Sequence, residues 1–249
     1  MARRSLLAQP WRPWRPWRTF SAWAARLPSQ CAVCGSWPAQ RLCEACIARF
    51  AQPRARCSTC ALPLAGGARQ CGQCLRHPPL LDACIAALDY AYPWAGVLAE
   101  FKFRGDPAWA APLASLMRST PWAEPAIDAA DWLIPVPLSP ARLGERGFNQ
   151  AERLARTLSD QKSTHRLLLR VHSGAVQHTL NRAQRLRNLQ GAFAVDPLLV
   201  ETLRGRRVVL VDDVMTTGAT LHAAAQVLRQ AGVAHLTALV LARAPQPAQ

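Results

Sequence analysis

The feature that most constrains the fold is the stretch VVLVDDVMTTGAT at residues 208–220. Its first four residues are apolar β-formers without alternation, which indicates a strand buried on both faces, as in a parallel sheet covered by helices. The small, hydroxyl-rich turn leads into a predicted helix at residues 221–231, which Gly232 can end. Ligands of such sheets bind at the carboxyl ends of strands, and the carboxylates Asp212 and Asp213 lie there. The stretch therefore predicts an α/β fold with a ligand site at this turn.

The residue types around this turn suit a ribose 5-phosphate. Two adjacent carboxylates only accept hydrogen bonds, which matches two vicinal ribose hydroxyls. Backbone N–H groups at a helix start, with neighbouring hydroxyls, can surround a phosphate, and a glycine lets the backbone approach closely. The candidate ligand-binding residues are Asp212, Asp213, Thr216, Thr217, Gly218, Ala219 and Thr220. The alternatives are an ordinary turn without a ligand and an acidic Mg²⁺ site, as in receiver domains; neither a Walker A loop nor a Gly-x-Gly-x-x-Gly turn is present.

These thirteen residues resemble the signature of type I phosphoribosyltransferases, which bind 5-phosphoribosyl 1-pyrophosphate (PRPP). The resemblance implies a parallel sheet flanked by helices, and displacement of pyrophosphate from C1′ of the ribose with Mg²⁺ bound alongside PRPP. It also implies that Asp212 and Asp213 form the catalytic pair that holds the ribose hydroxyls, while residues 216–220 hold the 5′-phosphate. Some purine-salvage members carry a third acid in the loop that serves as a base. This chain has Thr216 there, so any base must come from elsewhere or from the substrate.

Basic residues in two other segments are candidates for the pyrophosphate. Residues 132–138 read as a strand that runs into a proline-punctuated turn. Arg142 and Arg146 follow, at the opening of a helix predicted to run to about residue 158, and offer the donors that pyrophosphate needs. The resemblance implies such a loop. Lys102, near the end of a predicted helix at residues 94–103, is a further substrate-binding candidate. An exposed basic helix start is the alternative for the two arginines.

Eight of the nine cysteines form four Cys-x-x-Cys pairs. Each pair can present two thiolates to one metal ion, and two pairs complete a tetrahedral site with no open position for catalysis. The simplest assignment is two structural Zn²⁺ ions; cross-braced pairing and iron–sulfur binding are alternatives, and a disulfide framework is disfavoured because no secretory signal accompanies the pattern. The predicted ligands are Cys31, Cys34, Cys43 and Cys46 in one site and Cys57, Cys60, Cys71 and Cys74 in the other. Cys84 is predicted to be a buried, small apolar residue.

Further sequence blocks resemble the ComF family of competence-associated proteins, which carry a zinc ribbon ahead of a phosphoribosyltransferase domain. The blocks are PVPL at 135–138, RGFNQ at 146–150, Gln177-x-x-Leu180, Arg185-x-x-Asn188 and Gly191-Ala192-Phe193. The likeness covers residues 31–242 and implies a link to DNA uptake. The Trp-Arg-Pro repeat at residues 11–18 matches nothing in that family.

A polar, Arg-rich segment at residues 173–190 lies between two strand-like runs. In the superfamily that the chain resembles, this region is a mobile loop that closes over the reaction centre and excludes water. The donors that could contact substrate there are Gln177, Arg182, Arg185, Arg187 and Asn188. A solvated helix face formed by Asn181, Arg185 and Asn188 is an equal alternative.

The chain, of 249 residues and 50% hydrophobic, is long enough for one full core and a small satellite domain. We predict a disordered basic Trp/Arg/Pro extension (residues 1–28), a double zinc-ribbon domain (29–78), a phosphoribosyltransferase-like α/β domain (82–243) and a tail (244–249). No apolar run is long enough to span a membrane, and no signal peptide is recognisable, so we expect a cytoplasmic protein.

Two functions follow as hypotheses. The first is a phosphoribosyltransferase that binds PRPP with Mg²⁺ and acts on an unknown acceptor. The second is a non-catalytic nucleic-acid-binding or assembly protein that senses PRPP, with single-stranded DNA or the DNA-uptake machinery as its partner. The formal charge of +15 permits binding of either phosphorylated ligands or nucleic acid.

Overall fold

We describe the fold from a computed structural model of the chain, in which residues 29–171 and 191–245 are described. The chain divides into two compact units, one ending at Cys43 and the other beginning at Glu44. In the first unit, Ser29 and Ala39 form an antiparallel bridge around the first cysteine pair. The second unit contains all the named helices and strands. The four domain limits expected from the sequence stay a prediction.

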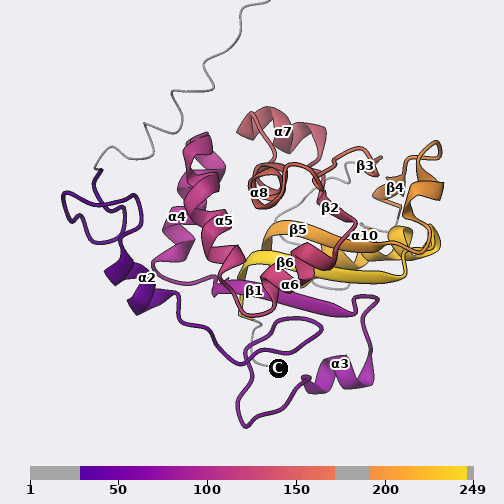
Figure 1. The fold of residues 1–249 in the computed structure, drawn as a ribbon, viewed down its shortest axis with the longest axis horizontal. Coiled ribbons are helices and arrows are strands. Elements are labelled where there is room, and N and C mark those ends of the chain that lie inside the picture. The colour runs from indigo at the N-terminus through magenta and orange to yellow at the C-terminus, as the bar shows by residue number, and fades with distance from the viewer. Residues whose placement is uncertain (1–28, 172–190, 246–249) are drawn as a thin grey trace, which may run out of the picture. The chain divides into compact units, whose positions relative to one another are not determined.

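A four-stranded parallel sheet forms the centre of the larger unit (Figure 1). The strand order is β1–β6–β5–β2, so β5 and β6 are central. The strands are β1 (Ala83–Asp89), β2 (Trp132–Pro135), β5 (Arg207–Met215) and β6 (His235–Arg243). Val208, Val209, Leu210 and Val211 of β5 are each at most 1% exposed, which confirms the predicted strand buried on both faces.

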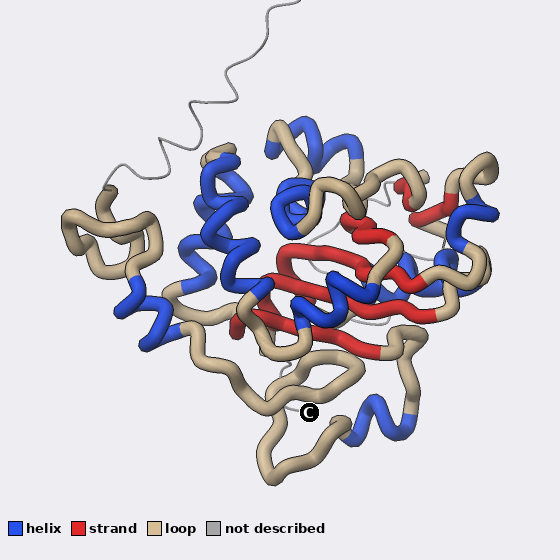
Figure 2. Tube along the Cα trace, in the orientation of Figure 1, coloured by secondary structure: helices blue, strands red, loops and turns tan. Residues whose placement is uncertain are grey.

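Helices cover the sheet, as Figure 2 shows. Contacts with the sheet strands are made by α5 (Ala110–Arg118), α6 (Ala123–Ala129) and α8 (Gln150–Leu158). α10 (Ala219–Gln230) shares a core with Val208 and Leu210, the alternate residues of β5. Because successive residues of a strand point to opposite faces, Val209 and Val211 face away from α10. The fold is therefore the predicted parallel sheet flanked by helices.

The remaining elements border this core. They are α2 (Glu44–Phe50), α3 (Gly72–Arg76), α4 (Trp94–Phe103), η1 (Pro107–Trp109), α7 (Pro140–Arg146), β3 (Leu168–Arg170), β4 (Phe193–Val195) and η2 (Val200–Leu203). β3 and β4 form a separate antiparallel pair. No helix in the described ranges is long and apolar enough to cross a membrane.

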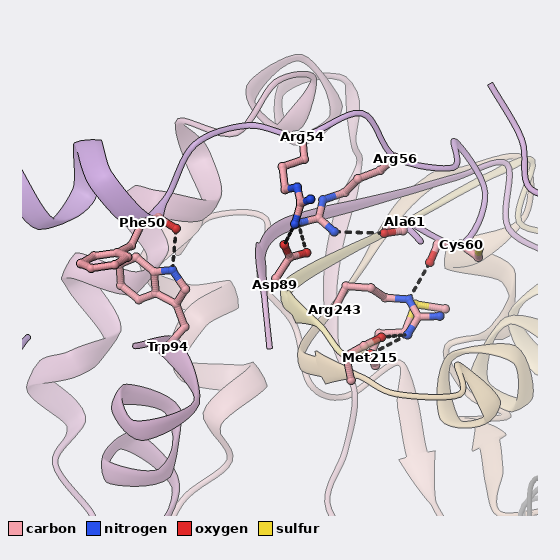
Figure 3. A network of polar contacts seen from close by, with 10 residues as sticks. Phe50, Arg54, Arg56, Cys60, Ala61, Asp89, Trp94, Met215 and Arg243 are labelled. Atoms are coloured by element: carbon pink, nitrogen blue, oxygen red, sulfur yellow. Dashed lines mark hydrogen bonds and ion pairs between the residues drawn. The ribbon is translucent and has the colours of Figure 1, made fainter. Parts of the chain in front are cut away.

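The second pair of cysteine knuckles, at residues 57–74, belongs to the larger unit. Its cysteines are part of the same hydrophobic core as α10 and the sheet. The N–H of Cys84 in β1 donates to the carbonyl of Ser58 over 2.7 Å. Arg54 and Arg56 both reach the carboxylate of Asp89 at the end of β1, at 2.6 and 2.8 Å (Figure 3). Cys84 itself is 5% exposed, which confirms the predicted burial. This cysteine-rich segment thus packs against the edge of the parallel sheet.

The segment that contains Arg142 and Arg146 differs from the prediction. One helix was expected from Arg142 to about residue 158, but the structure has two helices there, α7 and α8, and both arginines lie in α7. Ser139 caps the helix because its Oγ accepts the N–H of Arg142 over 3.4 Å, and Pro140 occupies the first position, where its missing N–H is harmless. Gly147, with φ of +73°, ends the helix. The strand predicted at residues 132–138 is also shorter in the structure, because β2 stops at Pro135.

Candidate ribose-phosphate site

Three candidate residues from distant segments meet at the carboxyl end of the sheet. The Nζ atom of Lys102 in α4 lies 3.1 Å from Oδ2 of Asp213 in β5. Nη1 of Arg146 in α7 lies 4.0 Å from the same oxygen. All three side chains are largely buried, so the charges interact with little screening by water. The result is one carboxylate facing two cations at the edge where sheet ligands bind.

Asp212 lies in a different environment from its neighbour. Its Oδ1 accepts the backbone N–H of Asp213 over 2.8 Å. Burial and the adjacent charge of Asp213 raise the pKa of Asp212 to about 7, against the opposing effects of that hydrogen bond, Lys102 and Arg146. Near neutral pH this carboxyl group therefore holds a proton for part of the time, and a ligand that needs the ionised form must displace it.

The phosphate loop, residues 216–220, connects β5 to α10. Thr216 is exposed, and Thr217 turns its Oγ1 back to accept the N–H of Ala219 over 3.3 Å. Gly218 has φ of +80° and stands at the N-cap position, without a side chain to bond the first N–H groups of α10. Those N–H groups lie at the positive end of a 12-residue helix, which is a favourable place for an anion.

Gly218 should not tolerate a side chain. A Cβ atom there would lie 2.5 Å from Cε of Met215 and 3.2 Å from Nδ1 of His222, in a backbone conformation that L-residues avoid. Gly218→Ala is expected to lower the free energy of unfolding by about 1–3 kcal/mol, measured by urea denaturation. Gly96→Ala is the control, because Gly96 is exposed in α4 and nothing lies within 4 Å of its added Cβ. Equal losses in both variants would contradict the strain argument.

Arg146 also contacts residues other than Asp213. Its Nη1 donates to Oε1 of Gln150 over 3.0 Å, and its guanidinium carbon lies 5.5 Å from the ring centroid of Phe103. Its Nε is buried and has no hydrogen-bond partner among the described residues. Arg142, on the same helix, is half-buried and not within ion-pair distance of either aspartate. The structure therefore brings Arg146, but not Arg142, to the acidic pair.

Arg170 is a candidate that the sequence reasoning missed. Its Nε is also buried and unpaired within the described ranges, and its guanidinium carbon lies 5.2 Å from the ring centroid of Phe193. Burial and the charge of Arg142 lower the pKa of Arg170, whereas the charge of Asp212 raises it, so both groups lie close by. One arginine at the end of a short apolar run gives no distinguishing signal in an Arg-rich chain. The predicted contacts at residues 173–190 lie outside the described residues.

The cysteines form two groups that suit tetrahedral metal binding. Within each group the four sulfur atoms lie within 4.8 Å of one another: Cys31, Cys34, Cys43 and Cys46, and Cys57, Cys60, Cys71 and Cys74. The Cys34–Cys43 and Cys60–Cys71 sulfur distances are both 3.7 Å. Zn–S bonds of about 2.3 Å in a tetrahedron place sulfurs roughly 3.8 Å apart, so the geometry fits zinc. The pairing is consecutive rather than cross-braced, and no disulfide joins the nine cysteines, all of which lie in the described part.

The larger cavity in the described part of the chain is not at this site. It has a volume of about 820 Å³ and is lined by β1 and by residues such as Trp122, Arg207 and His235. Arg207 and His235 are the first residues of β5 and β6, so this cavity lies toward the amino ends of the strands. None of the predicted ligand-binding residues lines it. The chemistry of the acidic pair and the phosphate loop is therefore independent of it.

Comparisons with known proteins show the family of this chain. Residues 116–249 match the family of phosphoribosyl transferase domains. The chain is 31% identical over 232 residues to the DNA utilization protein YhgH of Salmonella typhimurium, covering 89% of this chain and 96% of that protein. It is 33% identical over 195 residues to competence protein F of Haemophilus influenzae (76% and 84% covered) and 30% identical over 204 residues to competence protein ComFC of Bacillus subtilis (79% and 81%). A match over 89% of the chain must include the cysteine-rich segment.

Proposed function

This chain belongs to the ComF family, and from that premise we propose that it binds PRPP with Mg²⁺ and transfers the phosphoribosyl group to an acceptor, releasing pyrophosphate. One observation carries the proposal: Asp212 and Asp213 lie near the end of β5, just before the phosphate loop that leads into α10, and Lys102 and Arg146 converge on Asp213. Acceptors for ribose hydroxyls, donors for a phosphate and cations for a second phosphate group thus lie within one site.

Each group has a role in this proposal. Asp212 and Asp213 accept hydrogen bonds from the ribose hydroxyls, and the phosphate loop holds the 5′-phosphate. Lys102 and Arg146 exchange part of their interaction with Asp213 for the pyrophosphate oxygens, and Mg²⁺, held mainly by those oxygens and by water, neutralises further negative charge. Arg170, whose pKa is affected by the charge of Asp212, is proposed as a further donor.

The reaction consists of one displacement at C1′. The bond from C1′ to the pyrophosphate oxygen breaks with its electron pair going to pyrophosphate, and a nitrogen or other nucleophile of the acceptor forms the new bond. Positive charge develops on the ribose in an oxocarbenium-like transition state. The chain contributes by holding the ribose in place and by stabilising the departing charge with preorganised cations and N–H groups.

The two cysteine groups are structural in this proposal, and zinc is the ion that their geometry and thiolate ligands suit best. A bound ion supplies folding free energy to segments that bury little apolar surface. With four thiolates per ion, neither site keeps an open position for chemistry. A cytoplasmic location, where free thiols persist, is part of the same proposal.

PRPP binding is expected to strengthen as the pH rises through about 7. The ribose hydroxyls need the ionised carboxylate, and the raised pKa of Asp212 keeps it protonated below that pH. The same shift has the opposite sign for stability: a raised folded-state pKa stabilises the fold at low pH, and this contribution is lost as the pH rises through about 7. The dissociation constant measured at a series of pH values tests the prediction. Asp212→Asn, which cannot titrate, serves as the control and should remove this part of the pH dependence.

Pyrophosphate release tests the transferase activity. Metal-replete protein is incubated with PRPP, Mg²⁺ and a panel of nitrogen nucleophiles, namely nucleobases, amines and ammonia, and free pyrophosphate is measured. Release that requires one acceptor, and is lost in Asp212→Asn/Asp213→Asn, is the expected result. Tight PRPP binding without pyrophosphate release in the presence of any acceptor would contradict the transferase activity and favour a protein that senses PRPP.

The alternative candidate is nucleic-acid binding, favoured by the formal charge of +15. The names of its relatives point the same way, since they are called DNA utilization and competence proteins. Binding of single-stranded DNA is measured by fluorescence anisotropy over a series of salt concentrations. A steep loss of affinity with salt supports contacts to phosphates, and repetition with PRPP present shows whether the two ligands are coupled.

A further inference from the structure

Arg243, the last residue of β6, connects the second cysteine group to the phosphate loop. It is 1% exposed, and its register partner in β5 is Met215, directly before the loop. Nε of Arg243 donates to the carbonyl of Cys60 over 2.9 Å (Figure 3). Nη1 donates to the carbonyls of Met215 at 3.1 Å and Ala244 at 2.6 Å, and also to that of Thr216. One guanidinium thus joins a cysteine of the second group to the first residue of the loop.

The partners of this arginine are unusual for a buried charge. Among the described residues it forms no ion pair with a carboxylate, and its hydrogen bonds go to backbone carbonyls. Burial lowers the pKa of Arg243, which reflects the free energy needed to remove the charge from water. Because the fork of donors is rigid and planar, a shift of Cys60 must move either the guanidinium or its other partners.

A second connection between the second cysteine group and the phosphate loop involves the sulfur atoms of Cys84 and Met215. The Sγ atom of Cys84 lies 3.7 Å from Sδ of Met215, and the N–H of Cys84 donates to the carbonyl of Ser58, between two cysteines of the group. The Cε atom of Met215 fills the space that a side chain at Gly218 would need. Both ends of the phosphate loop therefore touch residues that the second cysteine group positions.

The phosphate loop is not fully packed on the side that faces the second cysteine group. A cavity of about 380 Å³ lies between the loop and the second cysteine group, and its lining residues include Cys60, Cys74, Met215, Thr217 and Arg243. A loop next to such a cavity can change its conformation if its hydrogen bonds are lost, because no close-packed side chains hold it in place. The hydrogen bonds of Arg243 are the main polar links across this gap in the described structure.

We propose that Arg243 is a positioning residue through which the metal ion of the second cysteine group holds the phosphate loop in its binding conformation. A metal ion fixes the Cys57–Cys60 knuckle and so the carbonyl of Cys60, and Arg243 passes that constraint to Thr216. Loss of metal from this group then loosens the loop and weakens phosphate binding. The consequence for affinity rests on the proposed PRPP function, whereas the coupling of metal to loop does not.

Hydrogen exchange tests the coupling without any ligand. Amide exchange of the peptide that spans residues 215–222 is measured by mass spectrometry in the wild type, in Cys71→Ser/Cys74→Ser and in Cys31→Ser/Cys34→Ser. Metal analysis should show one equivalent lost in each double variant. We expect exchange in this peptide to increase at least tenfold when the second group loses its metal and to stay within twofold when the first does. Equal exchange in all three proteins would overturn the proposal.

Arg243→Lys separates the link from the metal itself. Lysine keeps the charge, but all its donors lie on one nitrogen, whereas Arg243 bonds Cys60 through Nε and Thr216 through Nη1, so lysine cannot reproduce both bonds in the same geometry. The variant should retain both metal equivalents and still show faster exchange in the loop. This result decides the question even if Cys71→Ser/Cys74→Ser does not fold, and wild-type exchange in Arg243→Lys would overturn the proposal.

The affinity arm uses calorimetric titration with PRPP and Mg²⁺. Arg243→Lys and the second-group variant should each weaken binding at least tenfold, and the combined variant should be within threefold of the weaker one, because both changes cut the same link. If the wild type does not bind PRPP, the proposed function fails while the exchange result stands. If the wild type binds and both variants bind equally well, the coupling fails while the proposed function stands.

Discussion

Asp212→Asn/Asp213→Asn is expected to weaken PRPP binding by about 10²–10⁴-fold. Hydrogen bonds to charged acceptors contribute about 1.5–3 kcal/mol each, so the loss of two such acceptors removes about 3–6 kcal/mol of binding free energy. Asparagine keeps the size of each side chain, and the change removes the repulsion that raises the pKa of Asp212. The loss should therefore appear in the dissociation constant rather than in the thermal stability.

Asp82→Asn is the matched control for this double variant. Asp82 is also paired with an arginine, because Arg229 Nη2 lies 2.5 Å from its Oδ2, but it precedes β1 and so lies at the opposite end of the sheet. Its replacement should leave PRPP binding within about threefold of the wild type, a change of less than about 1 kcal/mol. Unchanged affinity in the double variant, with metal content and circular dichroism intact, would remove the acidic pair from the site.

Arg243→Met is expected to cause the largest loss of stability, about 2–4 kcal/mol in the free energy of unfolding. The substitution removes the arginine donor from four carbonyl groups, those of Cys60, Met215, Thr216 and Ala244, of which that of Met215 keeps the N–H of Ala244 at 2.9 Å. An unsatisfied buried polar group costs about 1–3 kcal/mol, and the removal of a buried charge offsets part of the sum. Urea denaturation of the metal-replete protein measures the effect.

Arg229→Met is the comparison with a partly exposed arginine. Arg229 also donates to three carbonyls, those of Leu80, Val233 and Ala234, at 2.9 to 3.0 Å. Its side chain is 25% exposed, so water can replace the lost donors and the expected loss is about 1 kcal/mol. Equal losses in the free energy of unfolding of the two variants would show that the burial of Arg243 does not increase its contribution to stability.

Local patterns along the chain predicted much of the fold. The uninterrupted apolar run before Asp212 identified the buried central strand, and helices were expected at residues 94–103 and 221–231, where α4 and most of α10 lie. These features depend on residues that are close in the sequence, so the spacing of apolar residues indicates them. The cysteine spacing likewise predicted both groups, because a knuckle is a local structure.

What the sequence could not supply depends on residues far apart in the chain. The division of the predicted helix into α7 and α8 was missed, because Gly147 was read as a residue within one helix. Arg243 and Cys60 are 183 positions apart, and only the parallel pairing of β5 and β6 places Arg243 beside the loop. In a chain with 30 basic residues, no local signal distinguishes a buried arginine from an exposed one. Lys102 was a candidate only as a cation near a helix end, and the fold brings it to Asp213.

The most direct test of the central claim is calorimetric titration of folded, metal-replete wild-type protein with PRPP and Mg²⁺. We predict saturable binding at one PRPP per chain, weaker binding of ribose 5-phosphate, which lacks the pyrophosphate, and loss of both in Asp212→Asn/Asp213→Asn. If PRPP produces no heat at several temperatures and fails to compete with ribose 5-phosphate, the acidic pair and the phosphate loop do not form a PRPP site.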